Sequence, residues 1–232
     1  KENLSNVNCK DRKVIYSYSA PLKENAGFLV LRSNFFDTAI MKISVVSKEF
    51  KERYLSDEKK PMEFTARAIV FDGPEHYHNE INNPDLNIDE NCILMIRGCG
   101  PIGYPGAAEV VNMQPPDYLL KKGITSLPCL GDGRQSGTSE SPSILNVSPE
   151  AAAGGGLAII KNNDLIKVDL NNKRVDLILD DSEIKSRFNE LKFNYPSNQT
   201  PWQELAREYT GQLGEGACLD LKEKYINVAE SK

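Results

Sequence analysis

Glycine and proline are concentrated in one short stretch of the chain, and this stretch limits the folds that are open to it. Six of the nine positions from 98 to 106 are glycine or proline. Such a density excludes regular helix or strand and indicates a loop that holds the backbone in special conformations. The loop follows the apolar run Cys92–Ile96, which is typical of a strand buried on both faces. A second glycine-rich loop, Gly131–Ser143, follows the strand candidate Ile124–Leu130. Functional residues commonly lie on such loops.

Hydrophobic periodicity predicts a β-rich α+β domain with several antiparallel strands and with helices on its outside. Apolar residues alternate over Phe64–Val70, the period of a half-buried strand. Asn-rich turns separate later segments at the spacing of hairpins. Strands are also expected at Phe28–Leu31, Ile40–Val46, Leu157–Ile160, Leu165–Leu170 and Arg174–Leu179, and helices at Lys48–Tyr54, Ala107–Met113, Asp117–Lys122 and Glu183–Leu191.

Local signals mark two further helix starts and one boundary. Ser148–Glu150 has the pattern of a helix cap followed by proline and an acid. Thr200–Gln203 has the pattern of a capping box, and the helix that it begins carries Trp202 on an apolar stripe that we expect in the core. Residues 1–26 are polar and irregular and are interpreted as a linker or lead-in, with one domain over residues 27–232.

Composition narrows the classes of function. The net charge is −5 and no basic run is present, which disfavours a nucleic-acid or anionic-membrane surface. The apolar runs are too short to span a bilayer, and the pattern of a secretory signal is absent. The five cysteines are an odd number without C-x-x-C spacing, which argues against a disulfide framework and a self-contained zinc site. We therefore expect reduced thiols and a cytoplasmic protein.

The second loop supports two interpretations from its residues alone. Gly131–Ser139 combines glycine with hydroxyl side chains, which can cradle an anion with backbone N–H groups, and Arg134 could pair with a carboxylate or phosphate. The loop could equally be a turn whose Ser and Thr side chains cap neighbouring backbone. It lacks the Gly-Lys-Ser/Thr ending of a Walker loop. Spacing alone favours the turn.

Both loops closely resemble those of the dihydroxy-acid and sugar-acid dehydratase family. The similarity covers nearly the whole chain from about Gly27 to Arg187, in the family's order. Thr138 stands where the branched-chain amino-acid enzymes carry a second glycine, so the motif resembles that of the sugar-acid (aldonate) branch. The resemblance implies a C-terminal, swivelling β/β/α domain with a β-barrel-like core and peripheral helices. The matching segments are Ala68–Asp72, Arg97–Glu109, Gly103–Met113, Gly131–Ser139, Asn146–Ala151 and Asp164–Asp169.

The resemblance implies a hydro-lyase that removes water from a 2,3-dihydroxy acid to give a 2-keto-3-deoxy acid. In this family Mg2+ would bind the substrate and stabilise the enolate that develops, and an iron–sulfur cluster would act as Lewis acid on the 3-hydroxyl. By its place in the motif, Ser136 matches the catalytic base, an alkoxide whose pKa a nearby cation must depress. Thr138 matches a residue that positions the substrate, and Glu109 matches the carboxylate that this domain gives to Mg2+.

The family's cluster cysteines and its remaining Mg2+ ligands lie in an N-terminal domain that has no counterpart in this sequence. The implied partners are the sugar-acid substrate, that missing domain and further copies in a homo-oligomer. Cys99 is therefore interpreted as a free thiol. We expect that the chain alone binds no iron–sulfur cluster, because a cluster needs several thiolates that converge on one place, and that it has no dehydratase activity.

Several of these residues have simpler interpretations. Glu109 could face solvent on a short helix, and Arg134 could bridge to Asp132 without a catalytic role. Asp72-Gly73-Pro74 is read as a turn. His76 and His78, two residues apart, would point in different directions on a helix and are interpreted as surface or turn residues rather than metal ligands.

Two other classes of function compete with the dehydratase. The chain could be a non-catalytic binding or interaction domain that keeps the fold. It could also be a phosphate-binding transferase domain, but the chain lacks the lysine and the metal-binding acids that such chemistry requires. Ser136, Thr138 and Glu109 together favour the enzyme, because a scaffold needs none of them. We expect the two glycine-rich loops to meet in space, with Ser136 and Glu109 opening toward one depression.

Overall fold

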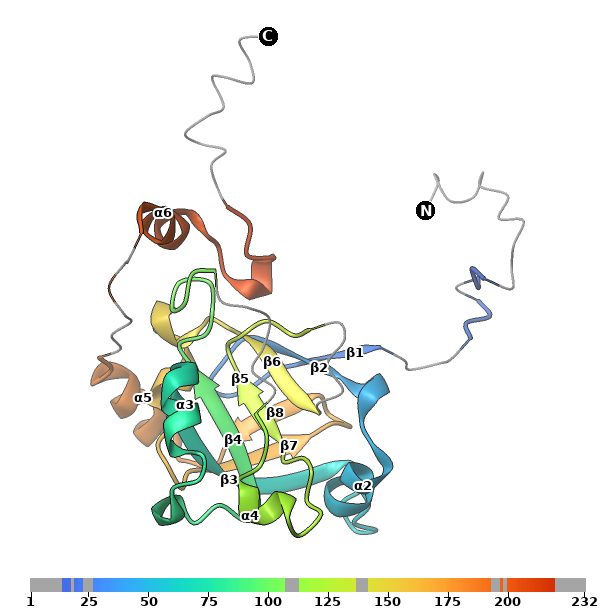
Figure 1. Ribbon diagram of the computed structural model, residues 1–232. Coiled ribbons are helices and arrows are strands. Elements are labelled where there is room, and N and C mark those ends of the chain that lie inside the picture. Colours follow the sequence, from blue (N-terminus) through green and yellow to red (C-terminus); the bar gives the residue numbers. More distant parts are fainter. Residues whose placement is uncertain are drawn as a thin grey trace.

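An eight-stranded sheet forms the centre of the protein in a computed structural model that describes residues 14–17, 19–22, 27–106, 113–136, 142–192, 197 and 200–219. The strand order is β1-β2-β6-β5-β4-β3-β7-β8, and the helices lie around the sheet (Figure 1). The strands are β1 (Phe28–Leu31), β2 (Thr38–Lys42), β3 (Glu63–Asp72), β4 (Cys92–Arg97), β5 (Cys129–Gly131), β6 (Ser143–Ser148), β7 (Leu165–Asp169) and β8 (Arg174–Leu177).

The four central strands are parallel, which the expectation of antiparallel strands missed. β3 pairs with β4, β4 with β5 and β5 with β6, each in parallel register. The outer pairs β1–β2, β2–β6, β3–β7 and β7–β8 are antiparallel, as the hairpin spacing predicts for β7–β8. Parallel neighbours need crossover connections, and these carry α3, α4 and the two glycine-rich loops.

The two edges of the sheet approach one another, so the sheet is a nearly closed barrel. Arg32, which follows β1, forms a parallel bridge with Arg174 at the start of β8. Beyond this bridge the side-chain amide of Asn34 pairs with the backbone of Leu177 in β8, as a neighbouring strand would. Its Nδ2 donates to the Leu177 carbonyl at 2.9 Å, and its Oδ1 accepts from the Leu177 N–H at 2.9 Å. These contacts satisfy edge groups that would otherwise be open to other chains. The expected α+β class with a barrel-like core is confirmed.

The helices are short and several begin at recognisable caps. They are α2 (Lys48–Phe50), α3 (Gly73–Glu80), α4 (Asp117–Leu120), α5 (Asp181–Asn189) and α6 (Pro201–Tyr209). The Ser47 side chain caps α2, and Thr200 and Gln203 form the predicted capping box of α6. In the part of the chain that the structure describes, no helix has the length and apolar character needed to cross a membrane.

The parallel strands are buried on both faces, as the continuous apolar run Cys92–Ile96 predicts. Alternate residues of β4 face two separate cores. Ile93 and Met95 belong to the core inside the barrel, with most other buried hydrophobic residues of the sheet. Leu94 and Ile96 belong to a second core, which β3 and β4 share with Tyr77 of α3 and other residues outside the barrel.

Several predicted elements differ in the structure. The strand expected at Ile40–Val46 occupies Thr38–Lys42, and a 3₁₀ helix follows at Ile43–Val45. Residues Leu157–Ile160 form no strand, because a 3₁₀ helix occupies Gly156–Ile159. The strand expected at Ile124–Leu130 is confined to Cys129–Gly131. Ser148 is the last residue of β6 rather than a helix cap, and a 3₁₀ helix follows at Ala151–Ala153. These segments are apolar or glycine-rich, and tertiary contacts rather than local pattern decide their conformation.

Further expectations concern Trp202, the segment Asp72–Pro74 and the two histidines. Trp202 was expected in the core, but 78% of its surface is exposed, and none of the residues of α6 is buried. Asp72–Pro74 is the beginning of α3 rather than a separate turn. His76 and His78 are exposed, as expected, although they lie on that helix.

Candidate functional site

The loops that the sequence singles out lie at one end of the barrel. Parallel strands β3, β4, β5 and β6 end at Asp72, Arg97, Gly131 and Ser148, and the carboxyl ends of adjacent parallel strands are where ligands bind in such sheets. In Figure 1, β4 and β5 point toward the same upper end, and α6 lies above it. The first glycine-rich loop follows β4, and the second follows β5.

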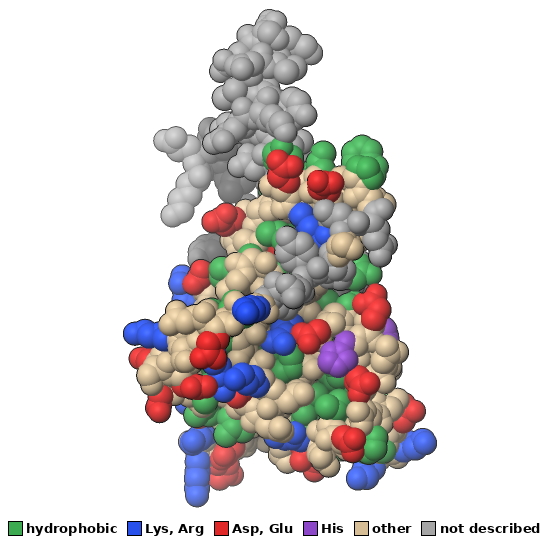
Figure 2. Space-filling view, turned by 90° about the vertical axis from the view of Figure 1, so that its left-hand side faces the viewer, with side chains coloured by type: hydrophobic (Ala, Val, Ile, Leu, Met, Phe, Trp, Pro, Cys, Tyr) green, Lys and Arg blue, Asp and Glu red, His purple; other side chains and the backbone are tan. Residues whose placement is uncertain are grey.

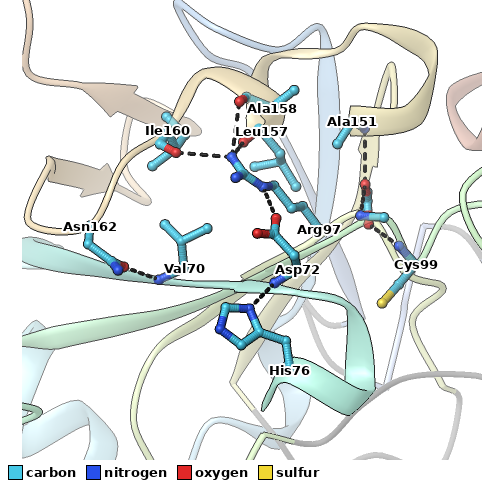
Figure 3. Close-up of polar contacts among 12 residues, drawn as sticks. Val70, Asp72, His76, Arg97, Cys99, Ala151, Leu157, Ala158, Ile160 and Asn162 are labelled. Atoms are coloured by element: carbon cyan, nitrogen blue, oxygen red, sulfur yellow. Dashed lines mark hydrogen bonds and ion pairs between the residues drawn. The ribbon is translucent and has the colours of Figure 1, made fainter. Parts of the chain in front are cut away.

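Asp132 joins the two loops. It is the first residue after β5 and none of its surface is exposed. Its Oδ2 accepts hydrogen bonds from Gly98 N at 2.9 Å and Ala151 N at 3.0 Å, and its Oδ1 accepts one from Cys99 N at 2.8 Å. Figure 3 shows the Cys99 and Ala151 ends of this cluster. One carboxylate thus binds the chain after three neighbouring strands.

Glu150 binds the next turn of the first loop. It follows β6 by two residues and is also fully buried. Its carboxylate accepts from Ile102 N at 2.9 Å and from Gly103 N at 2.8 Å. The sequence suggested only an acid in the first turn of a helix here. Together, Asp132 and Glu150 accept four backbone N–H groups of residues 98–103.

The C-terminal segment holds the same loop from above. Gln212 and Glu150 exchange two hydrogen bonds: Gln212 Nε2 donates to Glu150 Oε1 at 3.0 Å, and Glu150 N donates to Gln212 Oε1 at 2.8 Å. Arg207 of α6 donates through Nε to the Ile102 carbonyl at 2.9 Å. Gln212 was not recognised from the sequence, where an isolated glutamine 62 residues from its partner carries no signal.

Close packing explains why glycine recurs in the first loop. A Cβ on Gly100 would lie 2.4 Å from Glu150 Oε2, and a Cβ on Gly103 would lie 2.8 Å from the Gly98 carbonyl group. The loop therefore folds tightly over the Glu150 carboxylate and back on itself, as only glycine permits at these positions.

The approach to Ser136 is held by Asn146 of β6. Asn146 has a positive φ of 56°, which asparagine tolerates better than most residues. Its Oδ1 accepts from Gln135 N at 2.6 Å, and its N–H donates to the Gly133 carbonyl at 2.9 Å. These bonds fix the backbone up to Ser136, which is half-buried. Thr138 and Glu109 lie outside the described residues.

Arg97 secures the end of β4 where the first loop begins. Its Nε donates to Asp72 Oδ1 at 2.6 Å, and its Nη1 donates to the carbonyls of Leu157, Ala158 and Ile160 at 3.0 to 3.1 Å. Figure 3 shows this guanidinium between the carboxylate of Asp72 and the three carbonyls. Arg97 is therefore a structural cross-link that sets the starting point of the first loop.

Arg97 also borders a shallow hollow between residues 158–161 and the C-terminal end of α5. The hollow has a volume of about 250 Å³ and a largely basic rim of Arg97, Lys161, Arg187 and Lys192. The Arg187 guanidinium already pairs with Asp164 at 2.6 Å and with Glu183 at 2.8 Å. Figure 2 shows basic and acidic side chains interspersed on this face. The charge of the hollow is thus largely balanced by its own neighbours.

Burial governs the ionisation of the groups at the site. It raises the pKa of the Asp132 carboxyl, against the opposing effect of its backbone N–H donors. It also raises the pKa of Glu150, which the N–H groups of Ile102 and Gly103 oppose. Burial, followed by the nearby Asp132 charge, raises the pKa of the Cys99 thiol. Cys99 therefore remains a protonated thiol, which is a poor nucleophile and a poor metal ligand.

The described residues contain only part of what a metal site needs. Within these ranges, no three His, Cys, Asp or Glu side chains are grouped to hold a metal ion. Three of the four cysteines described are buried and all are free thiols, an arrangement that does not fit an iron–sulfur cluster. Gln135 Oε1, however, is buried without a hydrogen-bond partner beside Ser136 in the chain. Such an oxygen suits a hard cation such as Mg2+.

Comparisons with known proteins agree with the family resemblance of the sequence. The model of a family described as dihydroxy-acid/6-phosphogluconate dehydratase C-terminal matches residues 13–217. The chain is 56% identical to D-xylonate dehydratase of Caulobacter vibrioides, over 98% of the chain and 38% of that protein. It is 37% identical to L-arabinonate dehydratase of Rhizobium leguminosarum, over 89% of the chain and 34% of that protein.

A relative with a different named substrate is less similar. Dihydroxy-acid dehydratase of Acetivibrio thermocellus is 32% identical over 96% of the chain and 38% of that protein. In all three comparisons the chain spans little more than a third of the relative's length.

Proposed function

Because the chain belongs to the dihydroxy-acid/6-phosphogluconate dehydratase C-terminal family, we propose that it is the C-terminal part of a hydro-lyase acting on a sugar acid. The enzyme would convert a 2,3-dihydroxy acid into a 2-keto-3-deoxy acid. The observation that carries this proposal is the union of the two glycine-rich loops by Asp132 at the carboxyl ends of β4 and β5. This union gives Ser136 a built surrounding instead of an isolated turn.

The sugar-acid class is supported by the order of similarity. The relatives named for xylonate and arabinonate are 56% and 37% identical, against 32% for the dihydroxy-acid dehydratase of Acetivibrio thermocellus. Thr138 is the residue at which the chain departs from the branched-chain enzymes, and we assign it to substrate positioning.

In the proposed mechanism, Ser136 removes the proton from C2 of the substrate. A serine hydroxyl needs a lowered pKa for this role, and a positioned base of this kind contributes about 10²–10⁴-fold to the rate. Asn146 holds the backbone of Gly133 and Gln135, just before Ser136, and Asp132 ties the start of this loop to the first one. By its place in the motif, Glu109 would be an oxygen ligand of Mg2+. The side-chain oxygen of Gln135, in the same loop as Ser136, would be a second oxygen ligand. Bound Mg2+ supplies positive charge opposite the negative charge that develops on the substrate.

The remaining parts of the proposal concern the longer protein. We assign residues 27–232 to one domain, preceded by a linker. An iron–sulfur cluster would be held by the N-terminal domain that this sequence lacks. Homo-oligomerisation and a cytoplasmic location complete the proposal, and Cys92 and Cys99, which form no disulfide, support a reducing compartment.

The proposal is tested with the longer protein that contains this chain, reconstituted anaerobically with iron, sulfide and Mg2+. We expect 2-keto-3-deoxy acid formation from D-xylonate or L-arabinonate, with a lower kcat/KM for a branched-chain 2,3-dihydroxy acid. The isolated chain under the same treatment is expected to show no cluster absorbance and no turnover. A longer protein that is fully loaded yet inactive on all of these acids would favour the alternative, a binding domain that keeps the dehydratase fold.

A further inference from the structure

The first glycine-rich loop is held by two buried carboxyl groups that come from outside the loop. Four backbone N–H groups in residues 98–103 donate to the carboxylates of Asp132 and Glu150, at 2.8 to 2.9 Å. Both carboxylates are fully buried. Hydrogen bonds from backbone N–H groups to an ionised acceptor are about twice as strong as neutral ones.

The two carboxylates come from two different strands, so they connect separate parts of the site. Asp132 lies four residues before Ser136 in the second loop. It also accepts from Ala151 N, beyond β6. Glu150 lies beyond β6 and is fixed in turn by Gln212. A shift of either carboxylate would therefore change the position of the first loop relative to Ser136.

The geometry requires acceptors at every carboxylate oxygen. Asp132 accepts at Oδ1 from Cys99 and at Oδ2 from Gly98 and Ala151. An asparagine there would turn an NH2 group toward one of these N–H donors, because an amide has only one acceptor oxygen. The same holds for glutamine at position 150, where both oxygens accept. Isosteric amides therefore break the contact while they preserve volume.

From this arrangement we propose that Asp132 and Glu150 are positioning residues of the dehydratase site, which set the first glycine-rich loop against the loop of Ser136. The proposal rests on the proposed function for its catalytic part. Its structural part stands on the hydrogen bonds alone. Neither residue needs to touch the substrate, and each acts through the backbone of residues 98–103.

The structural part is tested on this chain by amide hydrogen exchange, resolved by residue. Asp132→Asn should speed exchange at Gly98 and Cys99 roughly tenfold, with Ile102 and Gly103 less affected. Glu150→Gln should give the reverse pattern. The control is Asp169→Asn, a buried acid at the opposite end of the barrel whose carboxylate accepts from Asn172. Equal exchange at residues 98–103 in all three variants would overturn the proposal.

The catalytic part is tested in the longer, cofactor-loaded enzyme. Asp132→Asn and Glu150→Gln should lower kcat about 10- to 100-fold, the effect of a displacement near 1 Å at a reacting group, at unchanged cluster content. Asp169→Asn should lower thermal stability but leave kcat unchanged. Unchanged kcat in the two site variants would overturn the proposal, whereas an inactive wild-type enzyme would count against the proposed function instead.

A milder variant tests the proposal even if the two amide variants do not fold. Gln212→Ala leaves both carboxylates in place and removes one neutral donor from Glu150. If the amide variants do not fold, Gln212→Ala should still speed exchange at Ile102 and Gly103 and lower kcat. A Gln212→Ala enzyme with wild-type exchange and wild-type kcat would refute the positioning role of Glu150.

Discussion

The two ends of the barrel hold their loops by different means. At the carboxyl end of the parallel strands, the contacts join residues far apart in sequence: Asp132 reaches Gly98, 34 positions away, and Glu150 reaches Gln212, 62 positions away. At the opposite end, two acids accept from near neighbours, although other contacts there join distant residues, such as Asn171 Nδ2 and the Pro61 carbonyl. Asp169 accepts from Asn172, and Asp89 accepts from Asn91. The two acids of the functional end thus depend on the completed fold, whereas Asp169 and Asp89 accept hydrogen bonds from residues two or three positions away.

The acids of the two ends also differ in how deeply they are buried. Asp132 and Glu150 lie at the functional end, fully buried among backbone N–H groups. Asp169 at the opposite end has 8% of its surface exposed, and its carboxylate accepts a hydrogen bond from Asn172, three residues away. Buried charge costs free energy unless hydrogen bonds compensate it, and this cost is met where loop geometry matters for chemistry.

The largest expected effect comes from filling space at the functional end. In Gly155→Ala the new Cβ would lie 1.8 Å from the Pro149 carbonyl oxygen. The backbone around Glu150 must then move, and we expect a loss of about 3 kcal/mol or more in the free energy of unfolding. The control is Gly211→Ala, whose Cβ would lie 3.8 Å from the nearest atom. Urea unfolding of both variants measures the contrast, and equal midpoints would contradict the described packing.

A smaller effect is expected when one long-range contact and one local contact are compared directly. Gln212→Ala should cost about 1–3 kcal/mol, because it removes a donor from a buried carboxylate. Asn172→Ala removes the side-chain donor from Asp169 and should cost less, because water can reach that carboxylate. Thermal unfolding ranks the two variants. A larger loss for Asn172→Ala would reverse the proposed contrast between the ends.

The smallest effect, and the one that differs in sign, is the dependence of stability on pH. Burial raises the pKa of Glu150 above its ordinary 4.5. Its contribution to stability is therefore fully present below the ordinary pKa and is lost as the pH rises through the folded-state value. For Asp169, hydrogen bonds from Asn172 lower the pKa below 3.8. Its contribution is present above the ordinary pKa and is lost as the pH falls through the folded-state value.

The two signs are separated by comparing each neutral variant with the wild type between about pH 3 and pH 7. The stability of the wild type relative to Glu150→Gln should fall as the pH rises, and its stability relative to Asp169→Asn should rise. Differential scanning calorimetry gives both differences. If both differences change in the same direction, the two acids do not occupy the environments described.

The sequence predicts the parts of the fold that depend on short-range pattern. The run Cys92–Ile96, the alternation over Phe64–Val70 and the capping box at Thr200 all lead to elements near their predicted positions. The order of the strands and the parallel pairing were missed, since pairing partners leave no local pattern. Trp202 was misplaced because periodicity identifies an apolar stripe but not what covers it.

The candidate site shows the same division. The glycine-rich loops and their meeting were predicted, and the bonds from Asp132 to Gly98 and Cys99 confirm the meeting for the described residues. The roles of Ser136, Thr138 and Glu109 rest on the resemblance and stay predictions. Glu150 and Gln212 could not be found from the sequence, because their importance arises from a contact across 62 positions.

The central claim, that this chain supplies the base of a dehydratase, is tested most directly at Ser136. In the longer enzyme, Ser136→Ala removes one oxygen atom and with it the group proposed to take the C2 proton. We expect exchange of that proton with solvent deuterium to fall by about 10²–10⁴-fold, with fold and cluster absorbance unchanged, and Thr138→Ala to have a smaller effect. A Ser136→Ala enzyme that exchanges the C2 proton at the wild-type rate would contradict the account and place the base outside this chain.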